Sequence, residues 1–205
     1  MKVTQDTLIP RPETEELCDL IHRHFSNLPT DINSLAINGI DLGTGSGCIP
    51  ILLLAKNSNW HFAGVDISSK ALEVANFNAN KHGVLDRFTA IEQDILETLT
   101  LTPNIQLLVS NPPYIPEKEM SETMPEVHQY EPKIALTDER DGLTFYRRFA
   151  EVGKSLIKPG GWMVLEVGLG KHPSKAVDIF QTAGYTQLEL IPDYNSDERV
   201  LKIQI

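Results

Sequence analysis

The regular alternation of strand-like and helix-like segments is the feature that most constrains the fold of this chain. Apolar runs typical of buried strands occur at 35–42, 61–65, 88–91, 105–110 and 162–167. Helical patterns lie beside them at 13–25, 48–56, 68–81, 143–157 and 174–183. This alternation predicts a doubly wound α/β fold, with a parallel sheet covered on both faces. Two last runs, 185–191 and 199–205, complete seven strands and predict an antiparallel edge.

Length and composition limit the classes of protein to which this chain can belong. The chain has 205 residues, enough for one core, so we expect a single domain over 13–205 after a proline-punctuated opening segment, 1–12. Its formal net charge of −10 disfavours a large nucleic-acid footprint, because such footprints need a basic face. No apolar run approaches the ~20 residues that span a bilayer, so no membrane partner is expected.

The two cysteines predict buried thiols in a reducing compartment, since they form no Cys-x-x-Cys pair. Cys18 and His22 are four residues apart on an expected helix, with His24 nearby. A metal site could begin with this spacing, but no second ligand pair is visible, so we favour a plain amphipathic helix and expect no metal. Without a signal or transit segment, the expected location is cytoplasmic, or mitochondrial for an organelle homologue.

A glycine-rich loop, 43–47, follows the first expected strand directly. Glycines at such a turn let the backbone approach a ligand and leave amides able to donate. The spacing fits neither a dinucleotide fingerprint nor a Walker loop. The carboxylate of Asp41, just before the loop, suits a cationic amino acid group better than a pyrophosphate. The candidate binding residues here are Asp41, Gly43, Thr44, Gly45 and Gly47.

Two further acids end later strands. Asp66, with Ile67 after it, ends the second strand, where a carboxylate can accept from both ribose hydroxyls of a nucleoside. The alternative role for Asp66 is to cap the helix that follows. Asp94 ends the third strand and could accept a hydrogen bond from an adenine amino group beside Ile95. Taken alone, Asp94 fits equally well the interpretation of an acidic residue in a surface loop.

The segment Asn111-Pro112-Pro113-Tyr114 ends the fourth strand. Its prolines stop the strand and stiffen a loop at the sheet edge where α/β proteins bind ligands. We expect the Asn111 side-chain oxygen and the Pro112 carbonyl each to accept one N–H of a flat –NH2 group. Tyr114 would pack its ring against that group. This segment is the predicted catalytic centre.

Together these residues describe a pocket for S-adenosylmethionine, and the chain resembles the class I (Rossmann-like) methyltransferases that use this cofactor. The segment 8–15, Leu-Ile-Pro-Arg-Pro-Glu-Thr-Glu, is similar to the signature of the HemK/PrmC family. Other family-like stretches are 41–48, 111–115, 131–136, 142–146 and 158–161. The resemblance covers nearly the whole chain.

The resemblance implies methyl transfer to the side-chain amide nitrogen (N5) of the glutamine in the Gly-Gly-Gln loop of class 1 peptide chain release factors, which would be the protein partner. Family members usually carry a helical N-terminal domain, so 1–12 is expected to be the remnant of a linker to it. Arg11 and Glu13 are candidates for ordering the site wall or touching the substrate, and a simple role in helix entry is an equal alternative for Pro12 and Glu13. The loop 114–141 is the candidate for partner contact.

Three alternatives stay open from the sequence. An adenine-N6 nucleic-acid methyltransferase needs the same grip on –NH2, but also a basic surface. A ribosomal-protein glutamine methyltransferase shares the Asn-Pro-Pro-Tyr loop and typically differs at the Pro-Glu-Thr-Glu segment. A cofactor-binding module without catalysis is the third, and the intact Asn111 loop disfavours it.

Overall fold

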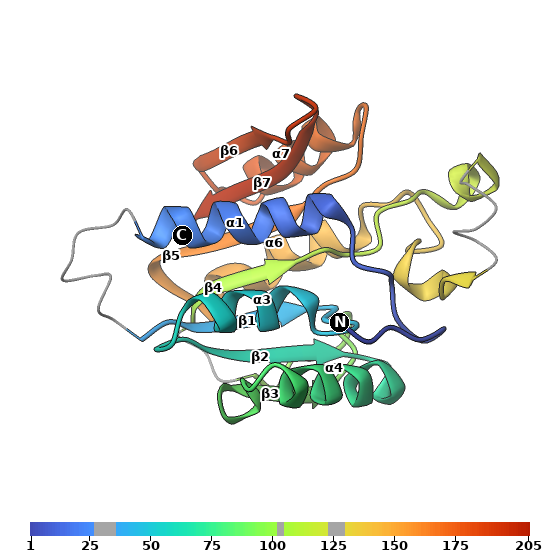
Figure 1. Cartoon of the computed structure of the whole chain (residues 1–205). Helices are drawn as coiled ribbons and strands as arrows, with labels where there is room; N and C mark the ends of the chain where they lie inside the picture. The colour runs from blue at the N-terminus through green and yellow to red at the C-terminus, as the bar shows by residue number, and fades with distance from the viewer. Residues whose placement is uncertain (27–35, 102–104, 123–129) are drawn as a thin grey trace.

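A computed structural model describes residues 1–26, 36–101, 105–122 and 130–205 (Figure 1). Its centre is a seven-stranded sheet in the order β3-β2-β1-β4-β5-β7-β6. The strands are β1 Asn38–Leu42, β2 His61–Asp66, β3 Phe88–Glu92, β4 Ile105–Ser110, β5 Ile157–Glu166, β6 Gln187–Pro192 and β7 Glu198–Gln204. The first five pair in parallel, and β7 runs antiparallel to both β5 and the edge strand β6. The expected mostly parallel sheet with an antiparallel edge is confirmed.

Helices cover both faces of the sheet, as the alternating pattern predicts (Figure 1). The main helices are α1 Pro12–Ser26, α3 Cys48–Lys56, α4 Ser69–Lys81, α6 Thr144–Leu156 and α7 His172–Thr182. The local sequence explains where two of these helices begin. Ser68 accepts from the Ala71 amide as the N-cap of α4, and Pro50 lies in the first turn of α3, where its missing N–H costs no bond.

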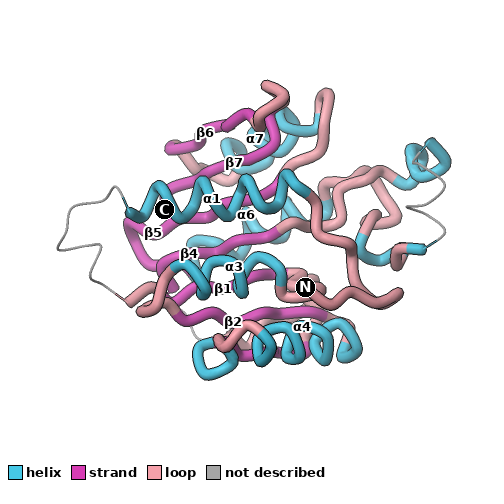
Figure 2. Tube along the Cα trace, in the orientation of Figure 1, coloured by secondary structure: helices cyan, strands magenta, loops and turns pink. Residues whose placement is uncertain are grey.

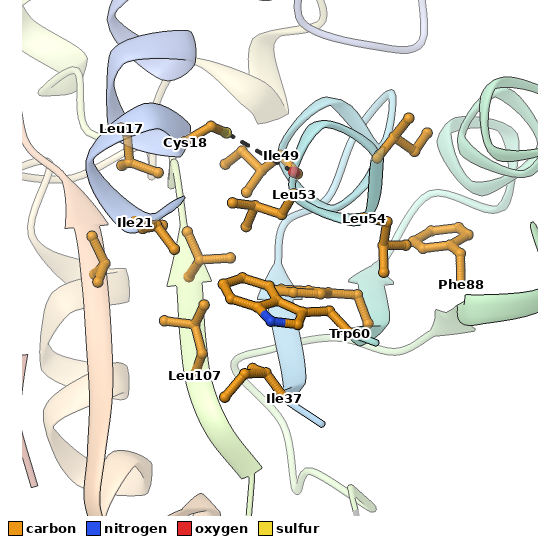
Figure 3. Packing of buried hydrophobic residues seen from close by; sticks show 14 of the residues in the cluster. Leu17, Cys18, Ile21, Ile37, Ile49, Leu53, Leu54, Trp60, Phe88 and Leu107 are labelled. Atoms are coloured by element: carbon orange, nitrogen blue, oxygen red, sulfur yellow. Dashed lines mark hydrogen bonds between the residues drawn. The ribbon is translucent and has the colours of Figure 1, made fainter. Parts of the chain in front are cut away.

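Two apolar cores, one on each face, fix the sheet between the helices. Leu107 and Val109 of β4 pack under α1 and α3, while Leu108 packs against the α6 and α7 side. Figure 3 shows the first core, which includes Leu17 and Ile21 of α1 and in which Cys18 points toward Ile49 of α3. Because alternate strand residues point to opposite faces, the continuous apolar run of β4 is buried on both sides.

The start of β5 differs from the expectation. The sequence predicts a turn at 158–161 and a strand from Trp162, but β5 begins at Ile157. Gly160 donates to the Ile205 carbonyl and Ile205 donates to the Gly161 carbonyl, so this stretch stays within the sheet. The register against β4 shifts between Ile105 and Leu107, which makes 158–161 a bulge.

Other boundaries agree closely with the sequence pattern. The expected loop 27–33 and the first residue of the expected strand at 35–42 lie outside the described residues. Residues 123–129 of the expected loop 114–141 also lie outside them. The described part of that loop contains two short 3₁₀ helices, Glu117–Glu122 and Lys133–Ala135, and a bridge between Ile115 and Thr137.

The parallel strands bring their carboxyl ends to one edge, where the connecting loops gather (Figure 2). Pairing of Asp41 with Gly64 and Val109 aligns β1 with β2 and β4, so the segments after these strands become neighbours. The sheet order therefore assembles the candidate site from distant parts of the chain.

Among the described residues, no helix has the length and apolar character required to cross a membrane.

Candidate active site

A cavity of about 530 Å³ lies at the carboxyl edge of the sheet. Its wall includes the glycine loop, the ends of β2 and β3, and Asn111, Pro112 and Pro113 after β4. This volume is within the usual range of small-molecule sites. The sequence-predicted residues that line it are Gly43, Thr44, Gly45, Asp66, Ile67, Asp94, Asn111, Pro112 and Pro113. Most of the predicted cofactor residues thus meet in one pocket.

The amides of the glycine loop are used inside the protein, contrary to the expectation that they stay able to donate. Gly43 and Thr44 donate to the carbonyl of Val65, Gly45 donates to Asp66, and Gly47 donates to Thr44. The three glycines have φ of 80°, 53° and 77°, a conformation that favours glycine. The glycines therefore allow a ligand to approach the backbone closely, while the amides of Gly43, Thr44, Gly45 and Gly47 already have partners within the protein.

Asp66 both shapes the loop and lines the cavity. One carboxylate oxygen accepts from the Gly45 amide at 2.8 Å, and the other accepts from the Ser68 amide at 2.9 Å. Burial raises the pKa of Asp66, and these backbone bonds oppose the rise. A carboxylate has about four acceptor positions, so each oxygen keeps capacity for a ligand hydroxyl. Ser68, rather than Asp66, is the cap of α4.

Asp94 lies beside Ile95 and Leu96 on the same wall. Its carboxylate accepts from the Leu96 amide at 2.8 Å, which holds the turn after β3. Ile95 is 7% exposed and offers an apolar surface next to this acid. An acceptor beside an apolar side chain suits a flat heterocycle with an amino group.

Asp41 is buried beneath the loop and does not line the cavity. Neither of its carboxylate oxygens, nor the Thr44 hydroxyl, has a well-formed hydrogen bond within the described residues. Burial raises the pKa of Asp41 to about 7, while the nearby Thr44 side chain lowers it and Asp66 raises it further. Unpaired buried polar groups are rare in proteins, so these atoms mark a place that a polar ligand group would complete. Gly47 is likewise absent from the cavity wall.

Tyr114 is not part of the wall of this cavity and lines a second one of about 700 Å³. Its hydroxyl donates to Glu166 at 3.3 Å and accepts from Arg199 at 3.1 Å. Burial, with the carboxylate of Glu166, raises the pKa of Tyr114 to about 12. The second cavity also contains Glu13. The Asn111–Tyr114 segment therefore separates two cavities.

Arg11 has a structural partner rather than a place in either cavity. Its guanidinium donates to both oxygens of Glu131, at 2.7 and 2.8 Å, and the Glu131 side chain is 3% exposed. This pair fastens the start of α1 to the segment before Lys133–Ala135. Of the two roles considered for Arg11, ordering the site wall is the one that these contacts support.

Of the opening segment only Arg11 was a predicted site residue, yet Asp6, Thr7, Leu8 and Pro10 are part of the cavity wall. Asn78, fully buried in α4, accepts from the Lys2 amide and donates to the carbonyls of Lys2 and Ser46. This side chain joins the opening segment to the glycine loop. A polar asparagine on the buried face of an amphipathic helix was the available sequence signal. Ile134 and Phe145 also line the cavity and were missed.

The alternative metal site is not assembled. Cys18 lies 3.9 Å from the carbonyl of Ile49, His22 pairs with Asn57, and His24 packs edge-on against Trp162. The described parts of the chain contain no group of three or more metal-binding side chains. These three residues belong to the packing of α1 on the sheet.

The fold and site define an α/β methyltransferase, and comparisons with known proteins agree. A family model described as a methyltransferase domain matches residues 34–167. The release factor glutamine methyltransferase of Bacillus anthracis is 36% identical over 99% of this chain and 70% of its own length. The Bacillus subtilis protein of the same description is 36% identical over 97% of this chain. The chain belongs to the release factor glutamine methyltransferase family.

This chain also resembles a much longer protein and, at low sequence identity, solved structures of other methyltransferases. The bifunctional methyltransferase of Rickettsia typhi is 38% identical over 98% of this chain, which spans only 41% of that protein. A solved structure of the human Mettl16 catalytic domain in complex with MAT2A 3′UTR hairpin 6 has a TM-score of 0.77, with 100% of this chain and 74% of that chain covered. Its sequence identity is 16%, so that likeness concerns the fold alone.

Proposed function

We propose that this protein transfers a methyl group from S-adenosylmethionine to the side-chain amide nitrogen of the glutamine in the Gly-Gly-Gln loop of class 1 peptide chain release factors. The observation that carries the proposal is the meeting of Asn111 and Pro112 with the strand-end acids Asp66 and Asp94 in one cavity. The sequence identity to release factor glutamine methyltransferases supports the choice of substrate.

The residues of the cavity fit the chemical groups of S-adenosylmethionine. Asp66 would accept from the ribose hydroxyls, and Asp94 would accept from the adenine amino group, with Ile67 and Ile95 beside the ring. The carboxyl group of Asp41 and the unpaired Thr44 hydroxyl lie below the loop that the amino acid end would approach, and a cationic amino group there would favour the ionised form of Asp41. When bound, this cofactor supplies a methyl group on a positively charged sulfur, ready for nucleophilic attack.

Asn111 and Pro112 would orient the amide nitrogen of the substrate. An amide nitrogen is a poor nucleophile, because its lone pair is delocalised into the carbonyl. The Asn111 side-chain oxygen and the Pro112 backbone oxygen each accept one N–H, which fixes the direction of attack. These two bonds strengthen as the nitrogen becomes more positive, so they stabilise the transition state more than the ground state.

Tyr114 does not serve as the proton acceptor, because its pKa of about 12 keeps the hydroxyl protonated. Its ring and Glu13 line the second cavity, on the other side of the Asn111–Tyr114 segment. We assign the second cavity to the residues of the release factor that flank the glutamine, whose side-chain amide would itself enter the cofactor cavity at Asn111 and Pro112. The substrate-binding residues are then Asn111, Pro112, Pro113, Tyr114 and Glu13, with Arg11 supporting the wall.

A labelled-methyl transfer assay tests the proposal. The protein is incubated with S-adenosylmethionine and with release factor, with release factor carrying Ala in place of the loop glutamine, with ribosomal protein, or with DNA and RNA. We expect label on the unaltered release factor alone. Label on nucleic acid or ribosomal protein instead would favour the corresponding alternative, and absence of label on every substrate would contradict the proposed activity.

Asn111→Ala tests the catalytic assignment. This variant is expected to lose turnover and to keep nearly unchanged affinity for S-adenosylmethionine, because the lost amide holds the substrate. Asn76→Ala, on the exposed face of α4, is the matched control and should behave as the wild type. Turnover by Asn111→Ala at the wild-type rate would refute the mechanism.

A further inference from the structure

A chain of hydrogen bonds, part-buried at Asn111 and buried beyond it, leads from Asn111 to a fixed positive charge. The Asn111 Nδ2 donates to the Thr14 Oγ1 at 3.1 Å, and the Thr14 hydroxyl donates to the Glu166 Oε2 at 2.8 Å. The guanidinium of Arg199 donates to the Glu166 Oε1 at 3.2 Å. These residues come from the segment after β4, the first turn of α1, the end of β5 and the start of β7.

The direction of each hydrogen bond follows from the Arg199 end. Arginine can only donate, and the carboxylate of Glu166 faces three donors, from Arg199, Tyr114 and Thr14. Burial raises the pKa of Glu166, and the adjacent guanidinium of Arg199 opposes that rise. Paired with this fixed charge, Glu166 is a carboxylate that can only accept, so Thr14 must give it its hydroxyl proton. The remaining lone pairs of Thr14 can then only accept. Asn111 has to offer them its –NH2 group.

The order of hydrogen-bond donors and acceptors along this chain of residues selects one of the two orientations of the Asn111 side-chain amide. With the –NH2 group held on Thr14, the carbonyl oxygen of Asn111 is the end left for the cavity that this residue lines. In the opposite orientation, an N–H of Asn111 would face an N–H of the substrate, and two donors repel each other. The orientation is thus decisive for a residue that must accept.

We propose that Thr14, backed by Glu166 and Arg199, is a positioning residue that holds the Asn111 side-chain oxygen toward the amide to be methylated. The inference rests on the proposed function, because it assigns Asn111 the role of acceptor for the substrate –NH2 group. Thr14 lies in the Pro-Glu-Thr-Glu segment at the start of α1. That segment therefore acts on the reaction through Asn111, as well as through the entry of a helix.

Burial supports a positioning role over a purely stabilising one. Thr14, Glu166 and Arg199 are 4%, 0% and 7% exposed. A buried ion pair is a weak stabiliser, since removing two charges from water costs about as much as their attraction returns. The same pair is well suited to fixing a hydrogen-bond direction, because Arg199 keeps its proton at any working pH. Fold stability alone thus gives a poor account of this arrangement.

Three substitutions test the inference. Thr14→Val keeps the shape and removes the hydroxyl, Thr14→Ser keeps the hydroxyl, and Glu166→Gln replaces the obligate acceptor with an amide that can donate to Thr14. Glu189→Gln is the matched control, because Glu189 forms an exposed ion pair with Lys202 on the sheet edge. The turnover number, the KM for release factor, the Kd for S-adenosylmethionine and the melting temperature are measured for each variant.

We expect Thr14→Val to lower kcat about 100-fold, the size of effect that misplacement of a catalytic group produces, with the KM and the cofactor Kd nearly unchanged. Thr14→Ser should restore most of the turnover, and the control should match the wild type. Glu166→Gln should lower kcat as Thr14→Val does, and it should also lower the melting temperature, because it leaves the buried charge of Arg199 unpaired. For Thr14→Val, a structural role would instead change the melting temperature and KM together.

Asn111→Ala, run in parallel, separates this inference from the proposed function. Wild-type kcat in Thr14→Val, with an inactive Asn111→Ala, overturns the positioning role and leaves the proposed function intact. Full turnover by Asn111→Ala refutes the proposed mechanism itself. If Thr14→Val does not fold, Glu166→Gln and Thr14→Ser decide the question. Full activity of Glu166→Gln overturns the inference. An inactive Glu166→Gln together with an active Thr14→Ser supports it.

Discussion

The buried Asp41 makes stability of the ligand-free protein depend on pH in a predictable direction. Its pKa is about 7 in the folded protein and 3.8 in its ordinary state, mainly because burial disfavours the charge. Between these two values the unfolded chain has lost a proton that the folded protein still holds. Stability contributed by this proton is therefore fully present below pH ~4, falls as pH rises, and levels off above ~7.

The size of the effect follows from the shift. Each pH unit in this window removes about 1.4 kcal/mol, so the step from pH 5 to 7 removes about 3 kcal/mol. Asp41→Asn carries no proton to lose and resembles the neutral acid in shape. We expect the variant to match the wild type below about pH 4 and to exceed its free energy of unfolding by about 4 kcal/mol near pH 8.

Urea denaturation of both proteins across this pH range measures the difference. Subtracting the two profiles removes the titration of groups that they share. Asp86→Asn, on an exposed turn before β3, is the control and should give a flat difference. A flat difference for Asp41→Asn as well would show that Asp41 is ionised normally, and it would refute the account of its burial.

Three further substitutions have expected outcomes. Gly142→Ala should destabilise the protein by about 2 kcal/mol or more in urea denaturation, because φ is +78° and the new methyl carbon would lie 2.3 Å from the Tyr114 carbonyl oxygen. Arg11→Ala should cost about 1–3 kcal/mol in the same assay, since Glu131 loses both hydrogen bonds at a buried site; an unchanged midpoint would mean that the pair is not formed. Asp66→Asn should weaken S-adenosylmethionine binding about tenfold in calorimetry, because one oxygen acceptor becomes a donor; equal affinity would contradict its role.

The sequence predicts the architecture well because periodicity is a local property. The boundaries of α3 and β4 agree with the apolar pattern to the residue, and α4 begins at Ser69, one residue after the expected start. The bulge at 158–161 was not predicted, because Pro-Gly-Gly is typical of turns and its pairing with Ile205 depends on the end of the chain. Sheet pairing overrode the local preference there.

The site was predicted where its residues follow directly from strand ends. Asp66, Asp94 and Asn111 line one cavity because parallel strands finish at a common edge. The orientation of individual groups was not predictable in the same way. Asp41 lies under the loop, Tyr114 belongs to a second cavity, and the loop amides are occupied by Val65 and Asp66.

The sequence by itself determined which chemical groups this protein has and at which strand ends they occur. Only the tertiary structure decided how those groups act on one another. Thr14 is 97 residues from Asn111 and 152 from Glu166, and no periodic pattern joins such distances. Their meeting depends on β4 and β5 pairing side by side with α1 across them, which is settled by burying both apolar faces of the sheet.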